Sequence, residues 1–281
     1  MACRIAVVDY RKGNLKSVER GLVAAGGDAF VTDDAAAIAR ADAVVLPGVG
    51  AFADASATMR ELGQMEAVRN RIVVGAPFLG ICLGMHLLFE EGTEGAPQED
   101  DETSTHNAPG LAVLPGVVAA MPRTDAEGRA YKVPHVGWNT VTPPAYPAGG
   151  TIGARLSGLE SELTGATVPT KRVPHEPKRP ADASCEPGLP SDWASPSPSA
   201  AQVGFTCPLF AGIPAGEYFY FTHSYIAPTG PFVVAETAHS VTFPCAVQYR
   251  DTAFGVQFHP EKSSDAGAAV LRNFVSIVKG A

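Results

Sequence analysis

Along residues 5–81, short runs of apolar and β-branched residues alternate with segments in which apolar residues recur at helical spacing. This alternation predicts βαβ units, in which parallel strands form a sheet that helices cover on both faces. Ligands of such sheets bind beyond the carboxyl ends of the strands. The predicted strands cover residues 5–8, 29–31, 43–46 and 77–81, and the predicted helices cover residues 15–25, 35–40 and 55–71.

Two segments interrupt this alternation. Residues 90–102 are acidic and rich in glycine, which predicts a solvated loop with little burial. Residues from about 165 to 203 are rich in proline, mixed with Ser, Lys and Arg. Such a composition buries too little apolar surface to offset the entropy cost of ordering the chain. We therefore expect one domain over residues 1–281 with a flexible Pro-rich insertion, in which Trp193 is a candidate docking residue.

Ordered patterns return after this insertion. Apolar residues lie on one helical face over residues 266–278, which predicts a final helix with Asp265 as its N-cap. The β-rich runs before it, separated by short turns, cover residues 218–222, 232–235, 246–249 and 253–258.

Composition and charge exclude several classes of function. The 281 residues carry a formal net charge of −8, which argues against nucleic acid as a main partner because phosphate neutralisation needs clustered Lys and Arg. Five scattered cysteines do not form the dense, even set of a secreted disulfide framework, so we expect reduced thiols and a cytoplasmic protein. Residues 72–89 carry no formal charge, but a proline and three glycines interrupt them, so a membrane span is rejected.

The candidate chemistry centres on Gly80-Ile81-Cys82-Leu83-Gly84, a G-x-C-x-G sequence between a predicted strand and a predicted helix. The serine version of this pattern is a nucleophile elbow, a strained turn that holds the side chain above the sheet. Glycines suit the flanks because a side chain there would crowd the turn. A cysteine at a helix start also faces the positive end of the helix dipole, which favours the thiolate. A buried structural cysteine in a Gly-rich turn would have the same sequence.

A candidate base follows the predicted strand 253–258. His259-Pro260-Glu261 supplies both an imidazole and a carboxylate that could orient it, as a cysteine nucleophile requires. The alternative is a surface turn with an incidental His and Glu. Three other histidines, His106, His175 and His239, lie in polar or loop contexts and are predicted to be solvated.

A glycine-rich loop, Pro47-Gly48-Val49-Gly50, follows the predicted strand 43–46. Backbone N–H groups of such a loop can stabilise a developing oxyanion. The loop lacks the Lys-Ser/Thr tail of a phosphate-binding P-loop. A bare turn remains the alternative.

Together the three motifs resemble the class I (triad) glutamine amidotransferases, in which an oxyanion loop, a nucleophile elbow and an HPE turn occur in this order. Within that class, the sequence is similar to the glutaminase subunits of imidazole glycerol phosphate synthase. The resemblance implies a flavodoxin-like, three-layer α/β fold with a largely parallel central sheet and an additional antiparallel β portion. Further matching segments are Asp9-Tyr10, Gly13-Asn14-Leu15, Pro134-His135-Val136-Gly137-Trp138-Asn139, Thr222-His223-Ser224-Tyr225 and Lys262-Ser263-Ser264.

The same resemblance implies roles for individual residues. Cys82 would form a γ-glutamyl thioester, His259 would transfer protons, and Glu261 would orient His259. The oxyanion hole would involve Gly48, Val49, Gly50 and Leu83. Substrate contacts would come from His86, Glu94, Ser224 and Tyr225, and partner contacts from Trp138 and Lys262.

The implied substrate is L-glutamine, with no metal or organic cofactor. The implied partner is the cyclase subunit of imidazole glycerol phosphate synthase, which would form a heterodimer with this chain and receive ammonia through a tunnel. The cyclase would then make imidazole glycerol phosphate and AICAR in histidine biosynthesis. The alternatives are a class I amidotransferase that serves another acceptor, an inactive regulatory binding module, and a cysteine hydrolase without an ammonia acceptor.

Three features depart from the family pattern. The family usually has Gln at the position of His86, and a neutral imidazole has only one donor or acceptor at each nitrogen, so we expect altered glutamine affinity. Arg11-Lys12 replaces a pair of small residues that is common near the N-terminal signature. The Pro-rich insertion has no counterpart in the family.

Overall fold

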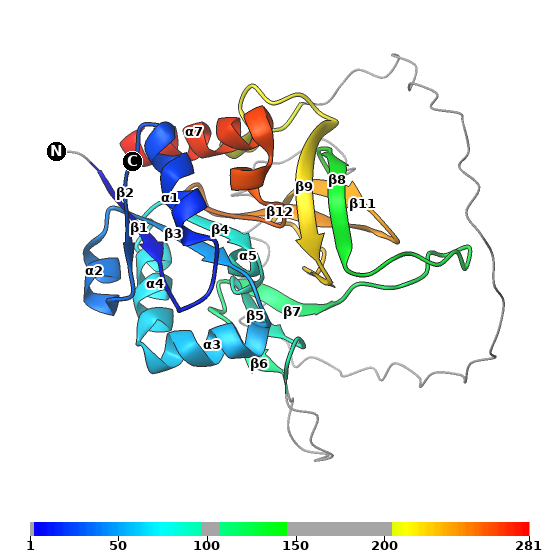
Figure 1. Cartoon of the computed structure of the whole chain (residues 1–281), viewed down its shortest axis with the longest axis horizontal. Helices are drawn as coiled ribbons and strands as arrows, with labels where there is room; N and C mark the ends of the chain where they lie inside the picture. Colours follow the sequence, from blue (N-terminus) through cyan, green and yellow to red (C-terminus); the bar gives the residue numbers. More distant parts are fainter. Residues whose placement is uncertain (1–2, 97–106, 145–203, 281) are drawn as a thin grey trace.

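The computed structural model describes residues 3–96, 107–144 and 204–280, and its centre is a seven-stranded sheet (Figure 1). The strands are β1 (Arg4–Val8), β2 (Asp28–Thr32), β3 (Ala43–Gly48), β4 (Phe78–Cys82), β11 (Val233–Ala238), β12 (Thr242–Tyr249) and β13 (Ala253–Val256). Their order is β11-β12-β13-β4-β3-β1-β2. Neighbouring strands from β2 to β13 are parallel, whereas β12 is antiparallel to both of its neighbours, β13 and β11. The predicted insertion at about 165–203, with Trp193, lies outside the described residues.

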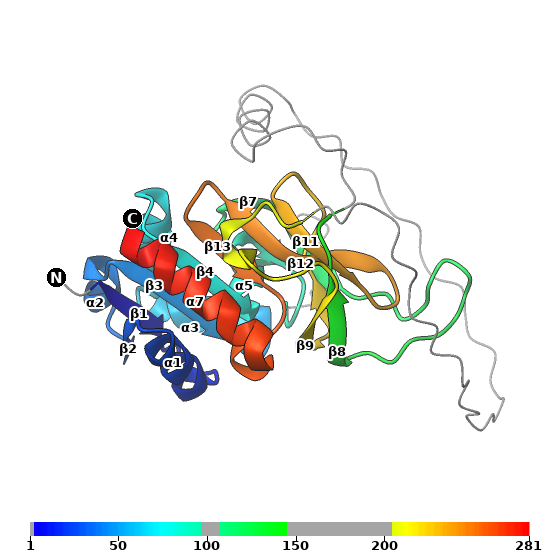
Figure 2. The ribbon, with the colours of Figure 1, turned by 90° about the horizontal axis from the view of Figure 1, so that it is seen from above.

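Helices cover both faces of this sheet. One layer contains α1 (Leu15–Ala24) and α7 (Ser264–Gly280), and the other contains α2 (Ala35–Arg40), α3 (Phe52–Glu61) and α4 (Gln64–Val73) (Figure 2). Because strand residues alternate between the two faces, Val45 packs beneath α1 and α7, while Val44 and Leu46 pack beneath the other three helices. The predicted three-layer α/β fold is therefore confirmed.

The helix predicted over residues 55–71 is two helices, α3 and α4. Leu62 ends α3, and Gly63 adopts a left-handed conformation (φ 69°) before α4 begins. Glycine adopts this conformation without the steric cost that a Cβ would bring. The apolar spacing continues across the break, which is why the pattern alone predicts one helix.

Additional strands lie beyond the carboxyl ends of the central sheet. The four-stranded sheet has the order β10-β7-β5-β6, with β5 (Phe89–Gly92), β6 (Ala108–Pro109), β7 (Leu114–Ala120) and β10 (Tyr225–Ile226). An antiparallel ribbon pairs β8 (His135–Val141) with β9 (Glu217–His223). The ribbon lies at the opposite end of the molecule from α2 and α4 (Figures 1 and 2).

Two local predictions are wrong. Residues 90–92, predicted as part of a solvated loop, belong to β5, because their backbone pairs with β6 and β7 while only Glu90 among them is exposed; residues 97–102 of that prediction lie outside the described residues. Asp265 is not the N-cap of the last helix, because α7 begins at Ser264 and Asp265 lies in its first turn.

No helix in the described part of the chain is long and apolar enough to cross a membrane.

Candidate active site

Cys82 ends β4 in a sharp turn, with φ 55° and ψ −108°, a conformation that residues other than glycine rarely adopt. The turn is possible because glycines stand on both sides of it. A Cβ on Gly80 would collide with the backbone of Gly84, and a Cβ on Gly84 would collide with the carbonyl group of Leu46. The crowding predicted for the G-x-C-x-G motif is therefore present.

The predicted helix after Cys82 is a single turn, α5 (Leu83–His86). Such a short helix has little macrodipole, so the predicted electrostatic effect on Cys82 reduces to the free N–H groups of this turn. Leu83 supplies the first of these groups and lines the same cavity as Cys82.

His259 and Glu261 follow β13 in a short 3₁₀ turn over Pro260–Lys262. Nδ1 of His259 lies 3.0 Å from Oε1 of Glu261, and the two side chains are 3% and 2% exposed. The backbone of His259 is fixed at both ends, since its N–H donates to the carbonyl of Tyr220 and its carbonyl accepts from the Ser263 hydroxyl. The HPE segment is therefore a buried, rigid unit rather than an incidental surface turn.

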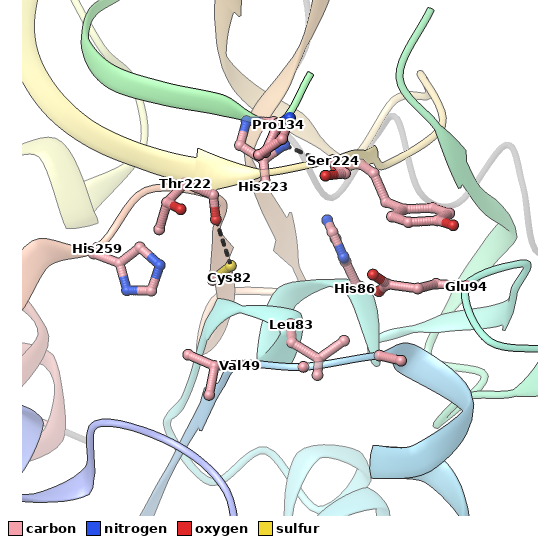
Figure 3. Close-up of a pocket in the computed structure, with 13 residues that line it drawn as sticks. Val49, Cys82, Leu83, His86, Glu94, Pro134, Thr222, His223, Ser224 and His259 are labelled. Atoms are coloured by element: carbon pink, nitrogen blue, oxygen red, sulfur yellow. Dashed lines mark hydrogen bonds between the residues drawn. The ribbon is translucent and has the colours of Figure 1, made fainter. Parts of the chain in front are cut away.

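The imidazole of His259 lies beside the sulfur of Cys82 (Figure 3). This follows from topology, because β13 and β4 are adjacent parallel strands that end at the same sheet edge. Burial lowers the pKa of His259, but interactions with Cys82 and Glu261 raise it more, to about 9. Its Nε2 is buried and has no hydrogen-bond partner among the described residues.

The glycine-rich loop leaves β3 directly beside the turn at Cys82, because Gly48 pairs with Cys82 in the β3–β4 ladder. Gly48 itself is buried against Leu83 and Gly84, whereas Val49 and Gly50 line the cavity. This position suits backbone N–H groups that face a tetrahedral intermediate on Cys82.

A cavity of about 420 Å³ opens over Cys82 and contains most of the predicted site residues. The lining residues are Val49, Gly50, Ala51, Cys82, Leu83, His86, Glu94, Pro134, Thr222, His223, Ser224, Tyr225 and His259. Gly48 and Glu261 do not line the cavity themselves but contact residues that do, Leu83 and His259 respectively. Trp138 and Lys262 do not reach it.

Glu94 places a carboxylate in the cavity wall. The backbone N–H of Phe52 donates to its Oε2 at 3.3 Å. Burial raises the pKa of Glu94 and outweighs the lowering effect of this hydrogen bond. Figure 3 shows Glu94 next to His86, on the side of the cavity away from His259.

His86 lies in the cavity wall, with its side chain directed toward Ser224 (Figure 3). Its Nε2 lies 2.6 Å from Oε1 of Gln257. Burial lowers the pKa of His86 to about 4, although the contact with Gln257 opposes this shift, so the ring is neutral at physiological pH.

Several residues at this site have no role in the sequence-based predictions. Gln257 donates from Nε2 to the Cys82 sulfur at 3.7 Å, and the Thr222 carbonyl lies 3.9 Å from the same sulfur. Pro134, His223 and Ala51 complete the lining of the cavity. A signal for Gln257 was present, because Gln257 and His259 are two residues apart and alternate positions of an extended chain face the same side.

His239 is not simply solvated, as predicted, but half-buried. Its ring stacks on His135 with centroids 4.3 Å apart, and its Nε2 contacts the carbonyl of Lys132 at 2.9 Å. His106 and His175 lie outside the described residues. Within residues 3–96, 107–144 and 204–280, no group of three or more His, Cys, Asp or Glu side chains is arranged to hold a metal ion.

Trp138 lies on an exposed face of the β8–β9 ribbon, and Lys262, in the 3₁₀ turn Pro260–Lys262, lies against the same face. The Trp138 side chain is 48% exposed and meets the edge of Tyr220 at 6.0 Å between ring centroids. Lys262 holds its ammonium group 5.9 Å from the centroid of the same Tyr220 ring. Val136 and Tyr218 are also exposed and extend this surface. Each lies two residues from Trp138 or Tyr220 on its strand, and alternate residues of a strand face the same side.

The known proteins that resemble this chain in sequence point to one family, and known structures share the fold of this chain. A chain from Moorella thermoacetica named "Imidazole glycerol phosphate synthase subunit HisH" is 36% identical over 279 residues, covering 99% of this chain and 96% of that protein. A protein of the same name from Syntrophotalea carbinolica is 34% identical over 272 residues, covering 96% and 98%. Two solved structures share the fold: a glutamine amidotransferase (TM-score 0.56, 16% identity, 98% of each chain) and PurLQS from Thermotoga maritima (TM-score 0.55, 13% identity, 100% and 99%).

The sequence model of the class I glutamine amidotransferases matches residues 6–278 of this chain, nearly its whole length. This match runs from within β1 to within α7, and so includes the glycine-rich loop, the turn at Cys82 and the HPE segment. The chain belongs to the class I glutamine amidotransferase family.

Proposed function

We propose that this chain is the glutaminase subunit of an imidazole glycerol phosphate synthase. It hydrolyses L-glutamine to L-glutamate and ammonia, and the ammonia passes to a cyclase subunit. The observation that carries this proposal is the convergence of Cys82, His259 and Glu261 at one edge of the sheet, beside a cavity large enough for an amino acid. The full-length likeness to subunits of that synthase supports this choice among the class I amidotransferases.

In the first half-reaction, the Cys82 sulfur, whose proton His259 has taken at Nε2, attacks as the thiolate. An S–C bond forms to the side-chain carbonyl carbon of glutamine while the C=O π electrons move onto the oxygen. Backbone N–H groups near Val49 and at Leu83 stabilise the negative charge on the carbonyl oxygen. With a pKa of about 9, His259 holds a proton at neutral pH. It donates this proton to the leaving nitrogen as the C–N bond breaks, so ammonia leaves and a γ-glutamyl thioester remains.

In the second half-reaction, His259 is the base. It takes a proton from water, the hydroxide adds to the thioester carbonyl, and the C–S bond breaks to release glutamate and the Cys82 thiolate. Glu261 accepts the Nδ1 hydrogen of His259 throughout, which keeps Nε2 directed at the reacting atoms.

Substrate recognition falls to the far side of the cavity. We assign the α-amino group of glutamine to the carboxylate of Glu94, with Ser224 and Tyr225 completing the pocket. His86 closes the same wall, where the neutral ring offers one acceptor nitrogen.

The cyclase docks on the exposed face of the β8–β9 ribbon in this proposal. Exposed aromatic residues such as Trp138 are typical anchors of protein interfaces, and Lys262 adds a charge at the rim. Docking there sets the partner beside the cavity, because Thr222 on the same ribbon lines it.

Transfer through the partner keeps ammonia from protonation in water. We place this single-domain subunit in the cytoplasm, as half of a heterodimer.

Ammonia release from glutamine tests the proposal directly. The rate is measured for the chain alone, with a purified histidine-pathway cyclase, and with that cyclase plus its phosphoribulosyl substrate. Strong stimulation by the pair is the expected result. Hydrolysis that ignores the cyclase would favour another acceptor, and the absence of hydrolysis under all three conditions would favour an inactive binding module.

A further inference from the structure

A buried chain of hydrogen bonds runs from His86 through Gln257 to Cys82. Nε2 of His86 lies 2.6 Å from Oε1 of Gln257, and Nε2 of Gln257 donates to the Cys82 sulfur at 3.7 Å. His86 is 3% exposed and Gln257 is fully buried. These hydrogen bonds therefore reach the Cys82 sulfur through the protein interior rather than through solvent.

The direction of each hydrogen bond follows from the chemistry of the groups. A carboxamide oxygen only accepts, so Nε2 of His86 must donate. The pKa of His86, lowered to about 4 chiefly by burial, keeps the ring neutral, and its single hydrogen is therefore on Nε2. With its oxygen engaged by His86, the Gln257 amide must turn its NH₂ group toward the sulfur.

The Gln257 backbone makes this orientation rigid. Its N–H donates to the carbonyl of Cys245 at 2.9 Å, so its side chain starts from a fixed position. Gln257 and His259, two residues apart in the segment after β13, then both approach Cys82. A donor aimed at a sulfur anion inside the protein, where the dielectric is low, is stronger than the same contact in water.

We propose that Gln257 is a further catalytic residue that donates a hydrogen bond to the Cys82 thiolate, and that His86 is the positioning residue that fixes the Gln257 amide. This inference rests on the proposed role of Cys82 as the nucleophile. It assigns His86 a task beyond substrate contact: its Nε2 face positions Gln257, and only its Nδ1 is left for the substrate. The contact stabilises the sulfur anion before attack and again when the thioester C–S bond breaks.

The test compares Gln257→Met, which keeps the length of the side chain but removes the donor, with His86→Phe, which keeps a ring but cannot donate. Gln248→Met is the matched control, because Gln248 is also a buried glutamine, on β12, and hydrogen-bonds the carbonyl of Arg250. For each full-length variant, the rate of Cys82 alkylation by iodoacetamide is followed from pH 5 to 10 by mass spectrometry of the Cys82 peptide. Values of kcat and KM are measured in the complex with cyclase and its substrate.

We expect Gln257→Met to move the alkylation profile about one pH unit toward higher pH, as the loss of a hydrogen bond to a charged group predicts. His86→Phe moves it in the same direction, and both variants lose about tenfold in kcat. KM changes less than threefold in Gln257→Met and rises further in His86→Phe, which also loses the Nδ1 contact with the substrate. His86→Gln recovers part of the kcat lost in His86→Phe, because a carboxamide can donate to Gln257. Gln248→Met leaves the profile in place.

An unchanged profile in Gln257→Met, or an equal shift in Gln248→Met, overturns the role of Gln257. A His86→Phe variant that raises only KM overturns the positioning role of His86. If Gln257→Met does not fold, His86→Phe still carries the test. A failure of the proposed function is distinguishable from a failure of this inference. If Cys82 is not the nucleophile, Cys82→Ala retains glutaminase activity; if only the role of Gln257 is wrong, Cys82→Ala is inactive and the wild-type enzyme is active.

Discussion

Gly48 and Cys82 are direct partners in the parallel ladder between β3 and β4. The glycine-rich loop and the turn at Cys82 therefore leave the sheet from the same position, and their spacing is set by sheet geometry rather than by flexible loops. Their contact is close: a Cβ on Gly48 would lie 2.6 Å from Cβ of Leu83 and 2.9 Å from the backbone nitrogen of Gly84. Only glycine allows the two turns to approach this closely.

Gly48→Ala is expected to lower both activity and stability, because its methyl group would displace the Leu83 turn. We expect a loss of about 1–3 kcal/mol in the free energy of unfolding, as for overpacking of a core, and at least a tenfold loss in kcat. Urea denaturation and glutamate production measure the two effects. Gly204→Ala is the control, since a Cβ there would meet no described atom within 4 Å; equal behaviour of the two variants would refute the explanation.

Glu261→Gln tests the orienting carboxylate. The amide keeps the shape of the side chain but removes the charge that stabilises the imidazolium of His259 at 3.0 Å. We expect kcat to fall about 10²-fold or more with little change in KM for glutamine, because the loss appears in proton transfer rather than in binding. A full-rate Glu261→Gln enzyme would show that His259 needs no such partner.

The raised pKa of His259 makes stability depend on pH. Because the ordinary value of 6.5 rises to about 9 in the folded protein, the stabilisation is complete below pH 6.5 and is lost as pH rises through 9. This shift corresponds to about 3 kcal/mol at most. Urea unfolding at pH 6, 8 and 10 should show this alkaline loss in the wild-type protein and a smaller one in His259→Asn; parallel curves for the two proteins would count against it.

Trp138→Ala tests the docking surface. The side chain is half-exposed on the ribbon and outside the cavity, so its removal should leave thermal stability and unstimulated glutaminase activity nearly unchanged. Affinity for the cyclase should fall at least tenfold, the usual effect of losing an aromatic anchor. Val74→Ala is the matched control, an exposed apolar residue at the end of α4. Titration calorimetry of both variants with the cyclase decides the point, and equal affinities would place the partner elsewhere.

The central sheet and the order of the site motifs were predictable from sequence because they rest on local signals. Buried strands such as β3 and β4 appear as short apolar runs, and the glycines at 80 and 84 mark a turn that no larger residue fits. The parallel-sheet rule then brings strand ends, and hence Cys82 and His259, to one edge.

The remaining features depend on long-range contacts that leave little local signal. Strand β5 contains two consecutive glutamates and resembles a loop, yet its backbone is paired on both sides. The contact of Gln257 with His86 joins residues 171 positions apart, and nothing in either local sequence indicates it. The break between α3 and α4 depends on one glycine conformation within a continuous apolar pattern.

The central claim is that Cys82 attacks the side-chain carbonyl of glutamine, and covalent trapping tests it most directly. The chain, bound to cyclase, is treated with 6-diazo-5-oxo-L-norleucine, a glutamine analogue that alkylates a nucleophile with loss of dinitrogen, and the labelled peptide is identified by mass spectrometry. We predict a single adduct on Cys82, prevented by excess glutamine and absent in Cys82→Ala. Labelling of Cys3, Cys207 or Cys245 instead, or an unlabelled Cys82 in an enzyme that releases ammonia, would contradict the account.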